Sequence, residues 1–187
     1  MSGRTKLLLL ASRLWYFSEG LLGPPLAVFS EQIGGEVLDI TAAWATYLIL
    51  SCLDYPVVGR LLNRSRWKFL MIAVDYALNT AFRFSYLLVT NTHQLLVVQL
   101  GLGLAEAIST PSWNAFYASQ LRCKDDTFAW GIAGGHPQFI SGIAIAIGGL
   151  IAEFVSFRTL FVTVGVLSLA ATAVQVRLSW IEERAVA

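Results

Sequence analysis

The chain has 187 residues, of which 56% are hydrophobic and only 13% are charged. Soluble domains carry roughly 25% charged residues, so this composition favours a membrane protein over a soluble one. The net charge of +1 gives no electrostatic basis for binding nucleic acid. Cys52 and Cys123 have no partner at metal-ligand spacing, so we expect free thiols, no bound metal and no cofactor.

The apolar residues gather in six blocks of roughly 20 residues, the length of a helix that crosses a hydrocarbon core of about 30 Å. Blocks of this length without strict alternation argue against the strands of a membrane barrel. We therefore predict an all-α integral membrane domain over residues 1–187. Its transmembrane helices are expected at 7–30, 41–59, 69–90, 94–118, 128–152 and 159–178.

The charges between these blocks predict the orientation of the chain. If the six spans alternate, ten basic residues fall on one side and only Arg158 falls on the other. The positive-inside rule then places both termini in the cytoplasm, and the protein in a plasma or inner membrane. The ten residues are Arg4, Lys6, Arg60, Arg64, Arg66, Lys68, Arg122, Lys124, Arg177 and Arg184.

The two halves of the sequence resemble each other. Three pairs of segments recur in the same order, at offsets of 87, 86 and 89 residues: Glu19–Pro24 with Glu106–Pro111, Asp39–Trp44 with Asp125–Trp130, and Gly59–Leu61 with Gly148–Leu150. The alternative is chance similarity between apolar helices, which three collinear matches argue against. Each unit, 1–92 and 93–187, holds three spans. Because three is odd, the second unit enters the membrane from the opposite side, and we predict a 3+3 inverted repeat.

The segment after the second span reads Gly59-Arg-Leu-Leu-Asn63-Arg64-Ser-Arg66-Trp-Lys68. It resembles the loop signature of the major facilitator superfamily, with Asn63 at the position of the signature's aspartate and Arg66 at that of its second glycine. The glycines of 99–105, and Gly131, Gly142, Gly148 and Gly149, resemble those of the family's fourth and fifth helices. The resemblance covers nearly the whole chain, at half the family's usual length.

The resemblance implies an N-terminal half of such a transporter. Halves in this family are related by a two-fold axis along the membrane normal, so it also implies that the chain pairs with itself as a homodimer. The first and fourth spans are then expected to line a central cavity. The segment after the second span is expected to act in gating, through Gly59, Asn63, Arg64, Arg66 and Lys68.

Polar and aromatic residues follow helical spacing on one face of the first and fourth spans. Glu19 and Glu106 lie near the middle of these spans and are equivalent in the repeat. Because a charged residue at a helix centre costs roughly 2.5–3.5 kcal/mol on insertion scales, each should face protein or water. The predicted substrate- or proton-binding residues are Glu19, Glu106, Tyr16, Gln99, Thr110, Trp113, Asn114 and Tyr117.

The other intramembrane charges are interpreted as structural. Arg13, Asp54, Asp75 and Arg83 are candidates for ion pairs, with Asp54 near Arg13 in depth and Arg83 within reach of Glu106. Under the alternative in which the glutamates are structural, Arg83 neutralises Glu106. His136 is interpreted as a buried imidazole whose hydrogen bonds are satisfied.

The predicted function is transport of a small solute across the bilayer by alternating access. Four carboxylates near the midplane of a homodimer would suit a cationic solute or proton-linked transport. The alternative is a non-transporting membrane subunit or assembly factor of the same fold. The sequence has no serine-hydrolase, zinc-protease or phosphate-loop motif, so we expect no enzyme activity.

Overall fold

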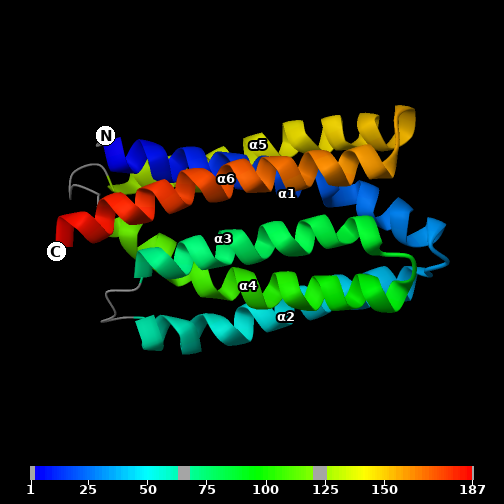
Figure 1. The fold of residues 1–187 in the computed structure, drawn as a ribbon, viewed down its shortest axis with the longest axis horizontal. Coiled ribbons are helices and arrows are strands. Elements are labelled where there is room, and N and C mark those ends of the chain that lie inside the picture. The colour runs from blue at the N-terminus through cyan, green and yellow to red at the C-terminus, as the bar shows by residue number, and fades with distance from the viewer. Residues whose placement is uncertain (1–2, 63–67, 120–125, 187) are drawn as a thin grey trace.

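The computed structural model describes residues 3–62, 68–119 and 126–186. In this part of the chain the expected helices form: α1 (Gly3–Gln32), α2 (Val37–Leu62), α3 (Lys68–Ser85), α4 (Thr92–Ser119), α5 (Asp126–Phe154) and α6 (Phe157–Val186), with a short 3₁₀ turn, η1 (Tyr86–Leu88), after α3. The helices run side by side along the long axis of the bundle (Figure 1). The N- and C-terminal ends lie at the same end of it, which we call the terminal end.

Within the part of the chain that the structure describes, four helices are long and apolar enough to cross a membrane: Val37–Leu62, Thr92–Ser119, Thr127–Phe154 and Phe157–Ile181. The α1 and α3 helices are not in this set. Charged residues along both helices lower their apolar character, among them Arg13 and Glu19 in α1 and Asp75 and Arg83 in α3. That these two helices also span the membrane therefore stays a prediction.

The helices do not pack in the order of the chain. The α1 helix packs mainly on α5 and α6, and α4 packs mainly on α2 and α3, while α3 also packs on α6. The α1 and α4 helices touch each other at only a few residues. They therefore face each other across the interior of the bundle, where the cavities described below lie.

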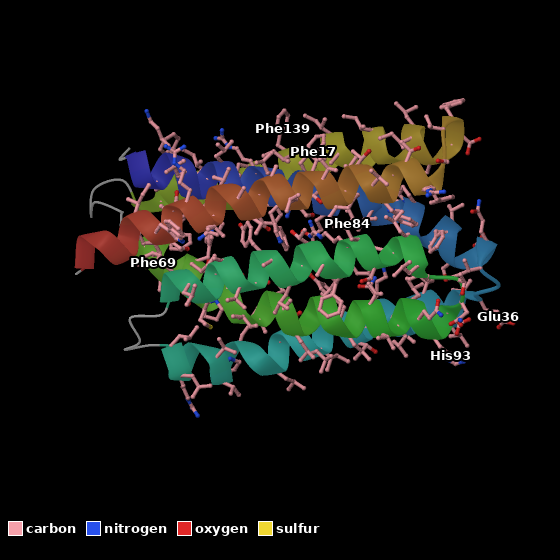
Figure 2. All side chains as sticks on the ribbon, viewed as in Figure 1. Phe17, Glu36, Phe69, Phe84, His93 and Phe139 are labelled. Carbon is pink, nitrogen blue, oxygen red and sulfur yellow. The ribbon has the colours of Figure 1, made fainter. Side chains whose placement is uncertain are left out.

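The α2 and α5 helices are the most exposed of the candidate spans. Only 12% of the apolar window of α2 and 17% of that of α5 is buried, against 56% for α4. Large apolar side chains are exposed on both helices, such as Leu48 on α2 and Phe139 on α5. Figure 2 shows Phe139 on the outer side of the bundle. Since exposed apolar surface of this extent is unfavourable in water, these faces meet lipid or another protein.

The α1 helix is kinked at Gly23, whose φ of −9° and ψ of −118° are not helical. Pro24 and Pro25 follow directly, and each removes a backbone donor from the helix. The two prolines therefore account for the kink. It divides α1 just beyond Glu19.

Close contact between α1 and α5 depends on Gly148. A Cβ atom there would collide with the backbone carbonyl of Leu21, whereas a Cβ on the next residue, Gly149, would meet nothing within 4 Å. Because backbone cannot yield as a side-chain tip does, Gly148→Ala must push α1 and α5 apart.

We expect Gly148→Ala to lower the free energy of unfolding by roughly 1–3 kcal/mol. Gly149→Ala is the matched control, and it should leave stability unchanged or slightly higher because alanine favours the helix. Unfolding of both variants in detergent, followed by circular dichroism, measures the difference. Equal stabilities would show that the α1–α5 contact is not close-packed.

Candidate functional site

A cavity of about 260 Å³ lies inside the bundle, in the half toward the terminal end. Helices α1, α3, α4 and α5 contribute its wall, so it occupies the space between α1 and α4. Its lining combines small hydroxyls, aromatic rings and one carboxylate: Ser12, Trp15, Tyr16, Tyr76, Glu106, Ser109, Thr110, Trp113, Asn114, Trp130, Ala133 and Gly134. We call it the larger cavity.

Glu106 is the charged group of this lining, and α2 supplies its partners. The hydroxyl of Tyr47 donates a hydrogen bond to Oε2 of Glu106, and that of Tyr55 donates to Oε1 at 3.4 Å. Tyr47, Ser51 and Tyr55 are spaced four residues apart, so they share the face of α2 that packs on α4. Ser51 donates from Oγ to the carbonyl of Gly103 at 3.2 Å. The carboxylate is thus held in place by two phenols.

Aromatic rings form much of the remaining wall. Trp113 stacks on Tyr117 with ring centroids 5.3 Å apart and an interplanar angle of 10°. Tyr117 itself does not line the cavity. It is only 4% exposed, and its hydroxyl donates to the carbonyl of Ala129 at 2.7 Å. Tyr117 is predicted as a binding residue, but in the structure it lies behind Trp113 and supports that ring.

A smaller cavity of about 40 Å³ lies in the other half of the bundle, away from the termini. That volume accommodates a water molecule. Glu19 and Gln99 line it, together with Arg83, Tyr47, Tyr86 and Trp44 and with the apolar residues Leu22, Gly23, Leu26 and Leu102.

The sequence groups eight residues into one site, and the structure divides them. Five line the larger cavity, Glu19 and Gln99 line the smaller one, and Tyr117 lines neither. The five are Tyr16, Glu106, Thr110, Trp113 and Asn114.

Arg83 is 3% exposed, and its hydrogen bonds go to neutral groups. It donates to Oγ of Ser168 at 3.1 Å and to the carbonyl of Trp15 at 3.4 Å. Its guanidinium also lies 4.9 Å from the centroid of the Trp15 ring, close enough for a cation–π interaction. Within the described residues, the candidate ion pair between Arg83 and Glu106 is not formed. The two groups interact only at longer range.

The other candidate ion-pair residues behave differently. Asp75 is 1% exposed and accepts a hydrogen bond of 2.5 Å from Nδ2 of Asn79 on the same helix. Arg13 is exposed, and the side chain of Asp54 lies outside the described residues. The proposed pairing of Arg13 with Asp54 therefore stays a prediction.

The candidate gating segment falls mostly outside the described residues, which leave out Asn63, Arg64 and Arg66. Lys68 begins α3, and its side chain is not described. Gly59 lies in the last turns of α2, where a Cβ would be 3.7 Å from the ring of Pro111 on α4. The gating assignment stays a prediction.

His136 lies half-buried on α5. Its Nδ1 is 3.0 Å from the carbonyl of Ile132, and its Nε2 is 3.4 Å from Oγ of Ser12. Both ring nitrogens have partners, as expected for a structural imidazole. Among the described residues, no three metal-binding side chains come together to form a metal site.

Several residues of the site are missed by sequence reasoning. Tyr47 and Tyr55 could be found only by knowing that α2 packs on α4, although their spacing on one helix face is visible in the sequence. Trp15, Tyr76, Ser109 and Trp130 complete the larger cavity. Trp130 could be selected from the sequence alone, because it matches Trp44 in the internal repeat.

A helical bundle with spans of membrane length and a polar cavity inside is the architecture of a membrane transporter. The sequence profile of the Major Facilitator Superfamily matches residues 8–186. The chain therefore belongs to the major facilitator superfamily, as the resemblance implies, and at 187 residues it is half-size for that family.

Curated relatives point to the same class. The chain is 35% identical over 92 residues to the "Proton-coupled antiporter flippase LtaA" of Staphylococcus haemolyticus, a match that covers 49% of this chain and 23% of that protein. It is 34% identical over 136 residues to the protein of the same name from Staphylococcus saprophyticus subsp. saprophyticus, covering 71% of this chain and 34% of that protein.

The chain thus spans about a quarter to a third of the length of these relatives. Family and relatives together support membrane transport by a multi-pass protein of the cell membrane.

Proposed function

We propose that the chain moves a small solute by alternating access and that the larger cavity is its binding site. The observation that carries this proposal is a carboxylate, Glu106, fixed among aromatic rings between α1 and α4 in a protein of a transporter family. Ligand sites in proteins are mostly apolar cavities with a few well-placed polar groups, and the larger cavity has this composition.

The lining favours a cationic solute. Glu106 is the one charged residue of the lining, and five aromatic rings surround the space that it faces: Trp15, Tyr16, Tyr76, Trp113 and Trp130. Aromatic faces attract organic cations, most strongly where water is excluded. A carboxylate with such rings is a suitable site for a substituted ammonium group.

The two cavities support the proposed 3+3 inverted repeat. With an offset of 87 residues between α1 and α4, and of 86 between α2 and α5, eight residues of the smaller cavity map onto eight of the larger one. The eight pairs are Glu19 with Glu106, Leu22 with Ser109, Gly23 with Thr110, Leu26 with Trp113, Trp44 with Trp130, Tyr47 with Ala133, Gln99 with Ser12, and Leu102 with Trp15. Four of the eight pairs lie outside the segments from which these offsets are read, namely those of Leu26, Tyr47, Gln99 and Leu102.

Helix packing also supports the repeat. Exchanging units 1–92 and 93–187 turns the α1–α5 pair into α4–α2 and the α1–α6 pair into α4–α3, which are the main contacts that α4 makes. The carbonyls of Tyr16 and Gly103, 87 residues apart, each accept a hydrogen bond from a serine of the packed helix, Ser141 on α5 and Ser51 on α2. The two serines are one helical turn apart in the repeat.

An inverted repeat suggests how access alternates. The larger cavity lies toward the terminal end, and its counterpart toward the other end is almost closed. We propose that the two units exchange conformations, so that the smaller cavity opens as the larger one closes. With both termini in the cytoplasm, the larger cavity would serve the cytoplasmic side.

We propose that two units pair about an axis normal to the membrane, either two copies or one copy and a second half-size unit. Polar side chains of α4 exposed to lipid do not supply the reason for pairing at two of the predicted site residues. Gln99 is 5% exposed and Glu106 is half-buried against α2. The broad apolar faces of α2 and α5 support pairing instead.

A proteoliposome assay tests the proposed function. Purified protein is reconstituted, its mass in detergent is measured, and uptake of quaternary ammonium probes and neutral solutes is followed with and without a pH gradient. The relatives are named proton-coupled flippases, so a lipid-anchored solute belongs in the panel. We expect uptake of a cation above that of empty vesicles, by a dimer. A monomer that moves none of the panel would favour the alternative, a non-transporting subunit.

A further inference from the structure

Tyr47 lies in the wall between the two cavities. It lines the smaller cavity together with Glu19, and its hydroxyl donates a hydrogen bond to Glu106 of the larger cavity. The carboxylate of Glu19 lines the same smaller cavity and lies within electrostatic range of this phenol. One phenol therefore lies between the two glutamates that line opposite cavities.

The surroundings of this connection are rich in acids. Arg83 on α3 lines the smaller cavity with Glu19 and lies within longer electrostatic range of Glu106, as Asp75 on α3 does. Tyr16 on α1 lines the larger cavity with Glu106, Tyr55 on α2 donates to it, and His136 on α5 contacts the ring of Tyr16. Three carboxylates thus lie within electrostatic range of one buried arginine, an excess of acid that favours binding of protons or cations.

We propose that Glu19, Tyr47 and Glu106 form a proton relay across the middle of the unit, an inference that rests on the proposed transport function. Glu19 takes a proton from water when the smaller cavity opens. Its O–H bond then breaks as that proton passes to Oη of Tyr47, while the Tyr47 O–H bond breaks and its proton passes to Oε2 of Glu106.

The relay conserves protons and charge. Glu19 ends as a carboxylate, Glu106 ends as a carboxylic acid, and Tyr47 remains a neutral phenol throughout. Rotation of the hydroxyl about its C–O bond restores the starting hydrogen bond. Glu106 then releases its proton into the larger cavity, where a cationic solute takes its place beside the carboxylate.

A phenol suits this position because a hydroxyl donates one hydrogen bond and accepts another at the same time. The relay occurs once in the unit. At the position equivalent to Tyr47 in the repeat, 86 residues later, α5 carries Ala133, which has no exchangeable proton. The two equivalent cavities are therefore connected through α2 and not through α5.

Tyr47→Phe tests the relay, because it removes the hydroxyl and keeps the ring. The readout is the ratio of solute uptake with an inward pH gradient to uptake without one. We expect this ratio to fall to about 1 in Tyr47→Phe and to remain above 1 in Tyr55→Phe, even where the loss of its bond to Glu106 lowers uptake itself. The control is matched, because Tyr55 also donates to Glu106 but does not line the smaller cavity.

A second measurement does not depend on the solute. Vesicles that enclose a pH-sensitive dye report proton entry after an external acid pulse, and we expect Tyr47→Phe and Glu19→Gln each to slow it at least fivefold relative to wild type.

Wild-type protein that moves protons but no solute would overturn the proposed transport and leave the relay standing. Unchanged proton entry in the variants, or equal losses in Tyr47→Phe and Tyr55→Phe, would overturn the relay. Thermal unfolding of each variant shows whether it has folded. If either Tyr47→Phe or Glu19→Gln has not folded, proton entry through the other variant tests the relay.

Discussion

Glu106→Gln should reduce uptake of a cationic solute at least tenfold. The change keeps the size of the side chain and removes the one charge that lines the larger cavity. A tenfold loss corresponds to about 1.4 kcal/mol, a modest share of what a buried, charge-assisted hydrogen bond contributes. The amide also offers only one acceptor oxygen to the hydroxyls of Tyr47 and Tyr55.

The control for this prediction is Glu153→Gln, which neutralises an exposed carboxylate near the end of α5. Its uptake should match that of wild type. The double variant Glu19→Gln and Glu106→Gln should in addition lose any dependence of uptake on pH. Normal uptake with an unchanged pH profile in the double variant would show that both glutamates are structural.

Arg83→Gln should lower the free energy of unfolding by about 3 kcal/mol. The substitution removes hydrogen bonds to Ser168 and to the carbonyl of Trp15, together with the stacking on the Trp15 ring. It also removes the buried positive charge that lies within electrostatic range of the carboxylates of Glu19, Asp75 and Glu106. An unpaired charge in the interior is far costlier than one on the surface.

Arg177→Gln provides the comparison, because Arg177 is exposed near the end of α6. Its effect should stay within about 0.5 kcal/mol. Unfolding of both variants by SDS titration in mixed micelles, followed by circular dichroism, gives the two values. Equal losses would mean that Arg83 does not serve as the shared counter-charge of the interior.

Much of the fold follows from local properties of the sequence. Blocks of apolar residues of membrane length predict where helices form, and the helices overlap all six predicted spans. The ends differ, because a helix continues beyond the hydrocarbon region. The last span is predicted at 159–178, whereas α6 runs from Phe157 to Val186. The predicted third span, 69–90, ends in the separate turn η1.

The site is less predictable, because it depends on which helices pack together. Helical spacing correctly places Glu106, Thr110 and Trp113 on one face of α4. It also selects Tyr117, one turn further on, where α5 comes close enough for its hydroxyl to bind the carbonyl of Ala129. The partners of Glu106 come from α2, which the sequence alone does not pair with α4.

Cysteine accessibility tests the central claim, alternating access within one unit, most directly. In a background with Cys52→Ser and Cys123→Ser, a single cysteine is placed at Thr110 in the larger cavity or at Leu22 in the smaller one. Labelling by an impermeant maleimide is then measured from each side of the vesicle membrane, with Lys6→Cys as a cytoplasmic reference. We predict that the Thr110 variant reacts from the cytoplasmic side and the Leu22 variant from the opposite side, and that a pH gradient or solute that raises one rate lowers the other. Rates that rise and fall together, or labelling of both positions from the same side, would contradict the account.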